Sequence, residues 1–298
     1  MEEELNVRTD LALEARGNVS EDSSAIKGIK VTQERDKENN ITITRLDVLN
    51  KNGAEAIGKP VGTYITIEAP DMTLEDDGSH REISIVMAEQ LKKIIIDTYN
   101  WNERLPKILI AGLGNSSSTP DALGPMVISN LMITRHIVEF CGYEEIEGAF
   151  AVTSAIVPGV MAQTGMESSE IIQAIIKKTK PDLLLVIDAL AARNIDRLNS
   201  TIQISDTGIW PGSGVGNNRM AIDKKNMGIP VISIGVPTVV DAATLVYDAI
   251  KKINNNDSAN LALDFKQMFV TSKDVAAIVK RLSYTISEGI NICMGLAE

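Results

Sequence analysis

The hydrophobic and polar positions of the chain first follow a strand period and then a helix period. Residues 41–49 and 61–69 alternate between apolar and polar side chains, as half-buried strands do, and residues 53–60 between them are rich in turn formers. In residues 81–100 the apolar side chains recur at helical spacing. This part of the chain therefore predicts a small antiparallel β element followed by a long helix.

From residue 107 onward, near-continuous apolar runs alternate with segments of helical period. Such runs are typical of strands that a sheet buries on both faces. The pattern predicts strands at 107–114, 149–153, 182–190, 201–204 and 230–235, and helices at 120–140, 168–178, 241–253 and 272–292. Strands that alternate with helices of ten or more residues indicate an α/β fold, so we expect a mostly parallel or mixed central sheet with helices on both faces.

Residues 1–25 differ from the rest of the chain because they are charged and polar, ending in the run GNVSEDSS. Such a segment buries little apolar surface, and we interpret it as a mobile N-terminal segment. It has neither the basic start nor the apolar centre of a signal peptide, and no later stretch contains 18 uninterrupted apolar residues. We therefore expect a cytoplasmic protein without a membrane partner.

Composition and charge narrow the class of protein further. A chain of 298 residues that is 44% hydrophobic can bury a sizeable core without disulfides. Its two cysteines, Cys141 and Cys293, show no CxxC spacing, which favours a reducing compartment. A net charge of −11 would repel a phosphate backbone, so direct nucleic-acid binding is not expected.

Two acidic residues follow predicted strands of the α/β pattern. Asp121 comes after the strand at 107–114 across the loop GNSSSTP, and Asp188 stands near the end of the run DLLLVIDAL. Ligands of open α/β sheets gather outside the carboxyl ends of the strands, so the two carboxylates share one cleft if their strands are neighbours. Paired carboxylates hold one proton between them, and such a pair can hydrolyse a peptide bond without a metal or a covalent intermediate.

Simpler interpretations of these residues remain open at this point. Asp121 also fits a first-turn acid that complements a helix dipole, with Thr119 as the N-cap. The carboxylates could instead bind a divalent ion. The two histidines, His80 and His136, lie in no zinc or triad motif.

Two glycine-rich loops leave another alternative open. The first has glycines at 112 and 114 but Ser117 where a dinucleotide fingerprint needs its third glycine, and no Walker lysine follows. It favours a tight strand-to-helix turn, with a noncatalytic phosphate- or nucleotide-binding module as the alternative function. The second loop, WPGSGVGNNR at 210–219, fits either a substrate channel or a surface loop.

Several longer motifs of the sequence point to one family of proteins. They are VRTDLALEA (7–15), GLGNSSSTPDALGP (112–125), PGVMAQTGMES (158–168), IDALAARNIDRLNSTIQISDTGI (187–209), PGSGVGNNR (211–219) and GVPTVVDA (235–242). In this order, and over nearly the whole chain, they resemble the motif series of the germination protease family.

The resemblance implies a concrete function. Members of that family are aspartate-dependent endopeptidases that cleave the small acid-soluble proteins coating DNA in dormant spores, and their fold is similar to that of hydrogenase maturation proteases. The resemblance puts the two catalytic aspartates on Asp121 and Asp188. It implies no cofactor and no metal, and a location in the forespore and spore core.

The resemblance also implies an inactive homotetrameric precursor that removes its own N-terminal segment. The family prefers an acidic residue before the cut, then a hydrophobic residue and an alanine, and Asp10-Leu11-Ala12 fits this order. We therefore predict processing between Asp10 and Leu11, in a segment whose mobility makes it accessible. Residues 1–10 are then a propeptide, and residues 11–298 a single peptidase domain with a small β subregion at about 27–75.

Four further residues lie in or near the resembling motifs. We expect Asp206 and Asp241 to support the site rather than to catalyse the reaction. Arg193 and Arg219 are candidates to pair with carboxylates of the substrate, a role that suits the forked donors of arginine.

Overall fold

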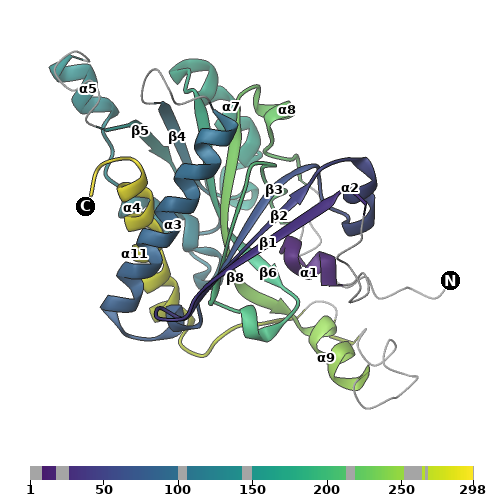
Figure 1. Ribbon diagram of the computed structural model, residues 1–298. Coiled ribbons are helices and arrows are strands. Elements are labelled where there is room, and N and C mark those ends of the chain that lie inside the picture. Colours follow the sequence, from purple (N-terminus) through teal and green to yellow (C-terminus); the bar gives the residue numbers. More distant parts are fainter. Residues whose placement is uncertain are drawn as a thin grey trace.

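The computed structural model describes residues 9–17, 27–99, 106–142, 150–212, 219–251, 264–265 and 268–297. Within these ranges, nine strands form one sheet in the order β1-β2-β3-β7-β8-β6-β4-β5, with β9 (Phe269–Val270) paired to β8. Helices pack on both faces of this sheet (Figure 1). The predicted α/β fold with a mixed central sheet is confirmed.

Four neighbouring strands of the sheet are parallel: β5 (Val152–Ile156), β4 (Lys107–Gly112), β6 (Leu183–Ala192) and β8 (Val231–Asp241). Successive side chains of a strand point to opposite faces, and both faces are apolar here. Leu183, Leu185 and Ile187 enter one core cluster, whereas Leu184 and Val186 enter another on the opposite face. Burial on both faces explains the uninterrupted apolar runs of the sequence.

The other half of the sheet is antiparallel and consists of β1 (Ile29–Asp36), β2 (Ile41–Val48), β3 (Gly62–Glu68) and β7 (Thr201–Ser205). The predicted pair of β2 and β3 is present. Because β3 pairs with β7 and β7 with β8, this element is part of the main sheet. The expected turn at 53–60 instead contains the helix α2 (Lys51–Ile57), capped by Asn50 and by Gly58 at a φ of 64°.

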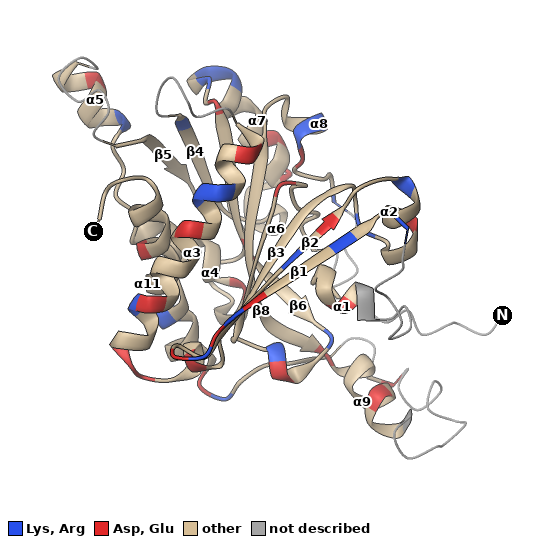
Figure 2. Cartoon of the chain, in the orientation of Figure 1, with Lys and Arg blue, Asp and Glu red and all other residues tan. Residues whose placement is uncertain are grey.

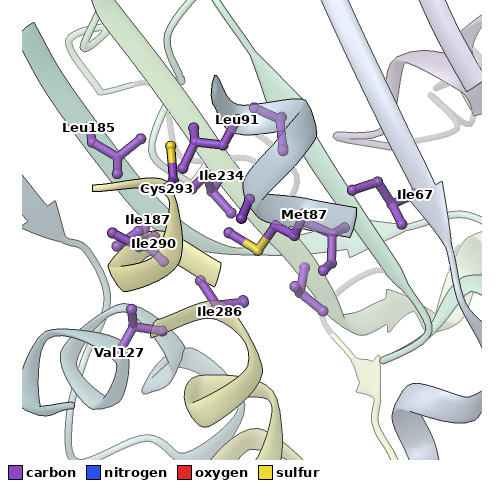
Figure 3. Close-up of a cluster of buried hydrophobic side chains, with 14 of the residues drawn as sticks. Ile67, Met87, Leu91, Val127, Leu185, Ile187, Ile234, Ile286, Ile290 and Cys293 are labelled. Carbon is purple, nitrogen blue, oxygen red and sulfur yellow. The ribbon is translucent and has the colours of Figure 1, made fainter. Parts of the chain in front are cut away.

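One face of the sheet is covered by α3 (Asp77–Thr98), α4 (Leu123–Ser129) and α11 (Val275–Cys293) (Figure 1). Figure 3 shows Met87 and Leu91 of α3 packed with Ile286 and Ile290 of α11 over the strands. The two long helices approach closely at Gly289. The β-carbon of any residue replacing this glycine would lie 3.0 Å from a backbone oxygen of α3, so the lack of a side chain allows the approach. This layer forms the largest core cluster among the described residues.

The opposite face is covered by α7 (Ser168–Thr179) and the short α8 (Lys224–Met227). Glu167 and Glu170 form a capping box that satisfies backbone amides at the start of α7. Lys177 and Lys178 lie in its last turn, where basic side chains complement the helix dipole (Figure 2). Helices on both faces of the sheet were predicted from the strand–helix alternation.

The prediction of a single helix at 120–140 is wrong. The chain forms the short 3-10 turn η3 (Thr119–Asp121), then α4, and then α5 (Arg135–Cys141). Polar side chains between α4 and α5 compete with the helical hydrogen bonds: the Asn130 side chain donates to the Met126 carbonyl oxygen at 3.0 Å, and the Thr134 hydroxyl donates to the Ala151 carbonyl oxygen at 2.8 Å.

The remaining elements are short or lie at the edges of the sheet. They are α1 (Ala12–Gly17), η2 (Pro70–Thr73), α6 (Met161–Thr164), η4 (Ile195–Arg197) and α9 (Ala242–Lys251). No helix within the described ranges has both the length and the apolar character to cross a bilayer.

The first described residues contradict the prediction of a mobile N-terminal segment. We interpreted residues 1–25 as mobile, but residues 9–15 are packed against the protein, with α1 next to α2 (Figure 1). Leu11 and Ala12 have an exposed fraction of 0% because they enter two apolar clusters. Most residues of the segment are polar, but the few apolar ones anchor it to the protein. Residues 1–8 and 18–26 lie outside the described residues.

Candidate active site

A pocket of about 940 Å³ opens beside the parallel strands, where the loop after β4 meets β6 and β8. Four of the residues predicted from the sequence line it: Asp10, Asp121, Asp188 and Arg219. Ligands of α/β sheets gather at this edge, so this pocket is the candidate active site. Most of the glycine-rich loop at 210–219 lies outside the described residues, but Trp210, Pro211 and Gly212 line the pocket.

Asp121 lies at the end of η3 and holds the loop after β4. Its carboxylate Oδ2 accepts the backbone N–H of Asn115 at 2.9 Å, and its own N–H donates to the Ser118 carbonyl oxygen at 2.8 Å. The helix α4 begins only at Leu123, and Thr119 lies inside η3, so Thr119 is not an N-cap. Asp121 is thus an acidic residue in the first turn of η3, and its carboxylate also binds a loop amide and lines the pocket.

The close turn at Asp121 depends on Gly114. This glycine has a φ of +110°, and a β-carbon there would lie 2.0 Å from the carbonyl oxygen of Asp121. A β-carbon at Gly112 would lie 2.4 Å from the carbonyl oxygen of Gly124 in α4. The glycines of this loop thus allow the close approach of η3 and α4 to the end of β4.

Asp188 lies on β6, the strand that runs parallel to β4 beside it. Gly112 of β4 pairs with Ile187, the residue before Asp188. The predicted condition for a shared cleft is therefore met. Only 7% of Asp188 is exposed, and its Oδ1 accepts the N–H of Ala189 at 2.9 Å. The two predicted carboxylates thus reach one pocket from neighbouring strands.

The environment of the pair favours its protonated forms. Burial raises the pKa of Asp188 well above its usual range, and the carboxylates of Asp121 and Asp10 raise it further. Burial also raises the pKa of Asp121, although the Asn115 amide and the charge of Arg219 oppose this change. Two neighbouring carboxylates titrate as one unit, and here the proton is held more readily at Asp188.

The chain around Asp10 runs into this pocket and pairs with the end of β6. The N–H of Asp10 donates to the Ala191 carbonyl oxygen at 2.9 Å, and the Ala191 N–H donates to Asp10 Oδ2 at the same distance. The N–H of Ala12 donates to Gln203 Oε1 at 2.7 Å. Leu11 is buried in the cluster of Leu190, Ala192 and Val240. Asp10 therefore lines the pocket, close enough to raise the pKa of Asp188, while Leu11 is buried beside it.

Lys59 and Gln203 were missed by sequence reasoning, and both contact the Asp10 carbonyl oxygen. Lys59 Nζ donates to it at 3.0 Å and to the Thr9 carbonyl oxygen at 3.3 Å, while Gln203 Nε2 donates to the Asp10 carbonyl oxygen at 3.3 Å. Burial lowers the pKa of Lys59, and the carboxylates of Asp10 and Glu14 oppose that shift. The carbonyl group before the predicted cut is thus held by an amine and an amide.

Glu14 fastens the same segment to the end of β6. Its carboxylate accepts the N–H of Arg193 at 2.7 Å and the N–H of Asn194 at 2.9 Å, and it also accepts the Thr9 hydroxyl. The guanidinium of Arg197 lies 3.6 Å away. Glu14 was not predicted as a site residue, and its contacts fix the position of the chain on both sides of Asp10.

Two predicted supporting aspartates lie outside the pocket. Asp206 Oδ1 accepts the N–H of Thr63 at 2.8 Å, which ties β7 to the start of β3, and burial raises the pKa of Asp206. Asp241 Oδ1 accepts the N–H and the hydroxyl of Thr244, at 2.7 and 2.9 Å, in the first turn of α9. These contacts are structural, and the supporting role remains a prediction.

The two predicted arginines differ in position. Arg219 lines the pocket, where its charge acts on both Asp121 and Asp188. Arg193 lies outside the pocket lining, and its guanidinium pairs with Asp248 at 2.7 and 2.9 Å. A role in binding carboxylates of a substrate is therefore better supported for Arg219 than for Arg193.

The geometry also bears on the alternative functions. The Asn115 amide, in the loop that could cradle a phosphate, is bonded to the carboxylate of Asp121. An anion would meet this negative charge, so the phosphate-binding alternative receives no support from the loop. Within the described ranges, no group of three or more His, Cys, Asp and Glu side chains is arranged to hold a metal ion.

Comparisons with known proteins identify the family of this chain. A family model for germination proteases matches residues 6–257. Germination proteases of Clostridium acetobutylicum and Caldanaerobacter subterraneus are 43% and 40% identical to this chain, covering 97% and 99% of it and 95% and 96% of their own lengths. The germination protease of Bacillus mycoides is 46% identical over 82% of this chain and 66% of its own length.

A solved structure of a nickel–iron hydrogenase maturation protease from Thermococcus kodakarensis is similar to this one with a TM-score of 0.35 and 18% identity. The similarity covers 66% of this chain and 99% of that protein. The site and the fold define an α/β protein with an acidic pocket, and the family match makes it a protease. The chain belongs to the germination protease family.

Proposed function

We propose that this germination protease is an aspartate-dependent endopeptidase that cleaves small acid-soluble spore proteins and first cuts its own chain between Asp10 and Leu11. One observation carries the proposal: Asp10, the residue before the predicted cut, lines the same pocket as Asp121 and Asp188. In this state the N-terminal segment lies along the wall of the pocket, with Asp10 among the lining residues. The protein is then a zymogen that becomes active after residues 1–10 leave.

The contacts of the N-terminal segment match the cleavage preference that the family resemblance implies. The carboxylate of Asp10 accepts the Ala191 amide, which suits an acidic residue before the cut. Leu11 fills an apolar cluster, and the small Ala12 is fully buried. A spore protein with the order acidic residue, hydrophobic residue and alanine would repeat these contacts.

The paired carboxylates supply the proton transfers of peptide hydrolysis. Asp188 holds a proton more readily than Asp121 because it is more deeply buried and adjoins two other carboxylates. Asp121 is then the base that takes a proton from water, and Asp188 is the acid that gives one to the leaving nitrogen. This use of the pair needs one carboxylate charged and the other neutral.

The partners and the location follow from the family resemblance. We propose that the precursor is a homotetramer in the forespore and that it acts in the spore core at germination. The excess of acidic over basic residues gives a net charge of −11, so the substrate is the spore protein itself rather than the DNA that it coats.

Cleavage in trans tests this function. The protein after loss of residues 1–10 is incubated with a peptide of the order Glu-Leu-Ala and with a matched peptide in which Lys replaces Glu. We expect cleavage of the first peptide before Leu and about 10²-fold slower cleavage of the second, because a lysine cannot accept the amide that binds the acidic side chain. Equal cleavage of both peptides, or of neither, would contradict the proposal.

A further inference from the structure

The carbonyl group of Asp10 has an unusual pair of donors. Lys59 Nζ and Gln203 Nε2 both point at its oxygen, at 3.0 and 3.3 Å. A backbone carbonyl in a sheet or turn usually accepts a backbone amide, and two side-chain donors on one carbonyl oxygen are a feature of sites that stabilise negative charge.

Local structure fixes Lys59 in this position. It follows Gly58, the left-handed residue that ends α2, and its own N–H donates to the Ala54 carbonyl oxygen at 3.2 Å. The next residue, Pro60, accepts the Tyr64 hydroxyl at 3.0 Å. The lysine therefore extends from a turn that is anchored to both α2 and β3.

Gln203 is fixed as well. It lies on β7 between β3 and β8, and 9% of it is exposed. Its Oε1 accepts the N–H of Ala12 at 2.7 Å, and a backbone N–H can only donate. The amide group is therefore oriented with its NH₂ toward the Asp10 oxygen, so the same side chain binds the chain on both sides of Leu11.

We propose that Lys59 and Gln203 are catalytic residues that polarise the carbonyl group of the bond to be cut, first in Asp10 and afterwards in the substrate. This inference rests on the proposed function, because it assigns the charge-stabilising part of the same reaction. It leaves the two carboxylates to handle the protons of water and of the leaving nitrogen.

The reaction balances with one water molecule. Its oxygen bonds to the Asp10 carbonyl carbon while Asp121 takes its proton, and the carbonyl π electrons move to the oxygen held by Lys59 and Gln203. The electron pair returns, the bond to the Leu11 nitrogen breaks, and Asp188 gives that nitrogen a proton. The products are a carboxyl group at Asp10 and an amine at Leu11, and proton exchange with solvent restores the pair.

The competing explanation is that these two side chains only dock the N-terminal segment. Lys59 also binds the Thr9 carbonyl oxygen, and Gln203 also binds Ala12, so both contribute to docking. A decisive experiment must therefore separate loss of docking from loss of chemistry.

The experiment measures two quantities on the full chain. The first is the rate at which residues 1–10 are lost from the wild type, Lys59→Met, Lys59→Arg and Gln203→Glu, with Lys51→Met as the matched control on the exposed start of α2. The second is hydrogen exchange of the Leu11 and Ala12 amides in each variant combined with Asp188→Asn, which keeps the chain uncut. Gln203→Glu retains the acceptor for Ala12 and removes the donor for Asp10, and it provides the test if Lys59→Met fails to fold.

We expect Lys59→Met and Gln203→Glu to slow the cut by about 10²-fold, the usual effect of removing one charge-stabilising donor, while the exchange of the two amides stays slow. Lys59→Arg should keep part of the wild-type rate, and the control Lys51→Met should keep all of it. Wild-type speed in Lys59→Met, or a slow cut with fast exchange of the amides, would overturn the inference. An uncut wild type would instead contradict the proposed function, so the two failures are distinguishable.

Discussion

The parallel and the antiparallel halves of the sheet contribute different chemistry to one pocket. The parallel half provides the paired carboxylates, Asp188 on β6 and Asp121 after β4. The antiparallel half provides Gln203 on β7 and Lys59 before β3, which hold the carbonyl oxygen of Asp10. The site therefore depends on the pairing of β7 with β8, where the two halves meet.

The difference shows how the fold separates two tasks. Strands buried on both faces form a rigid support for Asp188 within β6 and for Asp121 in the loop after β4, and both residues line the cleft. The antiparallel strands are amphipathic, and this half adds the side-chain donors to the Asp10 carbonyl oxygen, while the end of β6 pairs with the backbone of the same segment. The predictions below test this division, beginning with the largest expected effect.

Removal of one carboxylate from the parallel half should abolish cleavage. Asp121→Asn and Asp188→Asn are expected to lower the rate by about 10²–10⁴-fold or more, because an amide can neither take nor give the proton. Asp206→Asn is the matched control in the antiparallel half, and we expect it to keep the rate within about 3-fold, because its carboxylate binds Thr63 outside the pocket. Cleavage of a peptide substrate measures all three, and a large loss in Asp206→Asn would remove the distinction.

The sequence predicted the parallel half of the site better than the antiparallel half, for a physical reason. Asp121 and Asp188 follow long apolar runs, and a carboxylate after a buried strand must face a cleft or find a partner. Lys59 lies in a polar turn and Gln203 in a short alternating strand, where neither has a local signal. Their position depends on the pairing of β3 with β7 across more than a hundred residues, which a local pattern does not carry.

The period of the apolar residues predicted most strands and helices, but it did not predict the short polar interruptions between them. The helix expected at 120–140 is interrupted near Asn130 and Thr134, whose side chains form tertiary hydrogen bonds to the Ser283 hydroxyl and the Ala151 carbonyl oxygen. The N-terminal segment was misjudged because Leu11 and Glu14 find their partners only in the folded protein. In both cases tertiary contacts decided the local structure.

The loop of the parallel half should be intolerant of a side chain at Gly114. We expect Gly114→Ala to cost on the order of 3 kcal/mol and to reduce activity, because it combines a strained φ with a clash at the Asp121 backbone. Gly142→Ala is the control, since Gly142 has a similar φ of +90° but nothing within 4 Å of an added β-carbon. Denaturant unfolding compares the two, and equal losses would show that the approach to Asp121 is unimportant.

The anchor between the N-terminal segment and β6 should contribute less. Glu14→Ala leaves the N–H groups of Arg193 and Asn194 without their acceptor, and we expect a loss of about 2 kcal/mol. Self-processing should also slow because Asp10 loses its register. Glu139→Ala, which removes one exposed pair with Arg135, is expected to cost less than about 0.5 kcal/mol. Thermal unfolding provides the comparison, and similar losses would contradict the anchoring role.

The smallest effect concerns the charge of Asp188. Burial raises its pKa in the folded protein, so the folded chain binds more protons than the unfolded chain above the ordinary pKa. The contribution of Asp188 to stability is therefore fully present at acidic pH and lost as pH rises through the raised value. Asn does not titrate, so Asp188→Asn should gain stability over the wild type between pH 4 and pH 7, by at least about 1 kcal/mol. A gain in stability of Asp188→Asn that does not change with pH would contradict the raised pKa of Asp188.

The central claim is that the paired carboxylates cut the chain lying in their own pocket. The most direct test is the intact mass of the purified full chain over time at mildly acidic pH, because the raised pKa of Asp188 favours its protonated form, beside Asp121→Asn and Asp188→Asn. The account predicts loss of residues 1–10 from the wild type alone, at a rate that does not depend on protein concentration. Processing in either variant, or a cut at another bond, would contradict it.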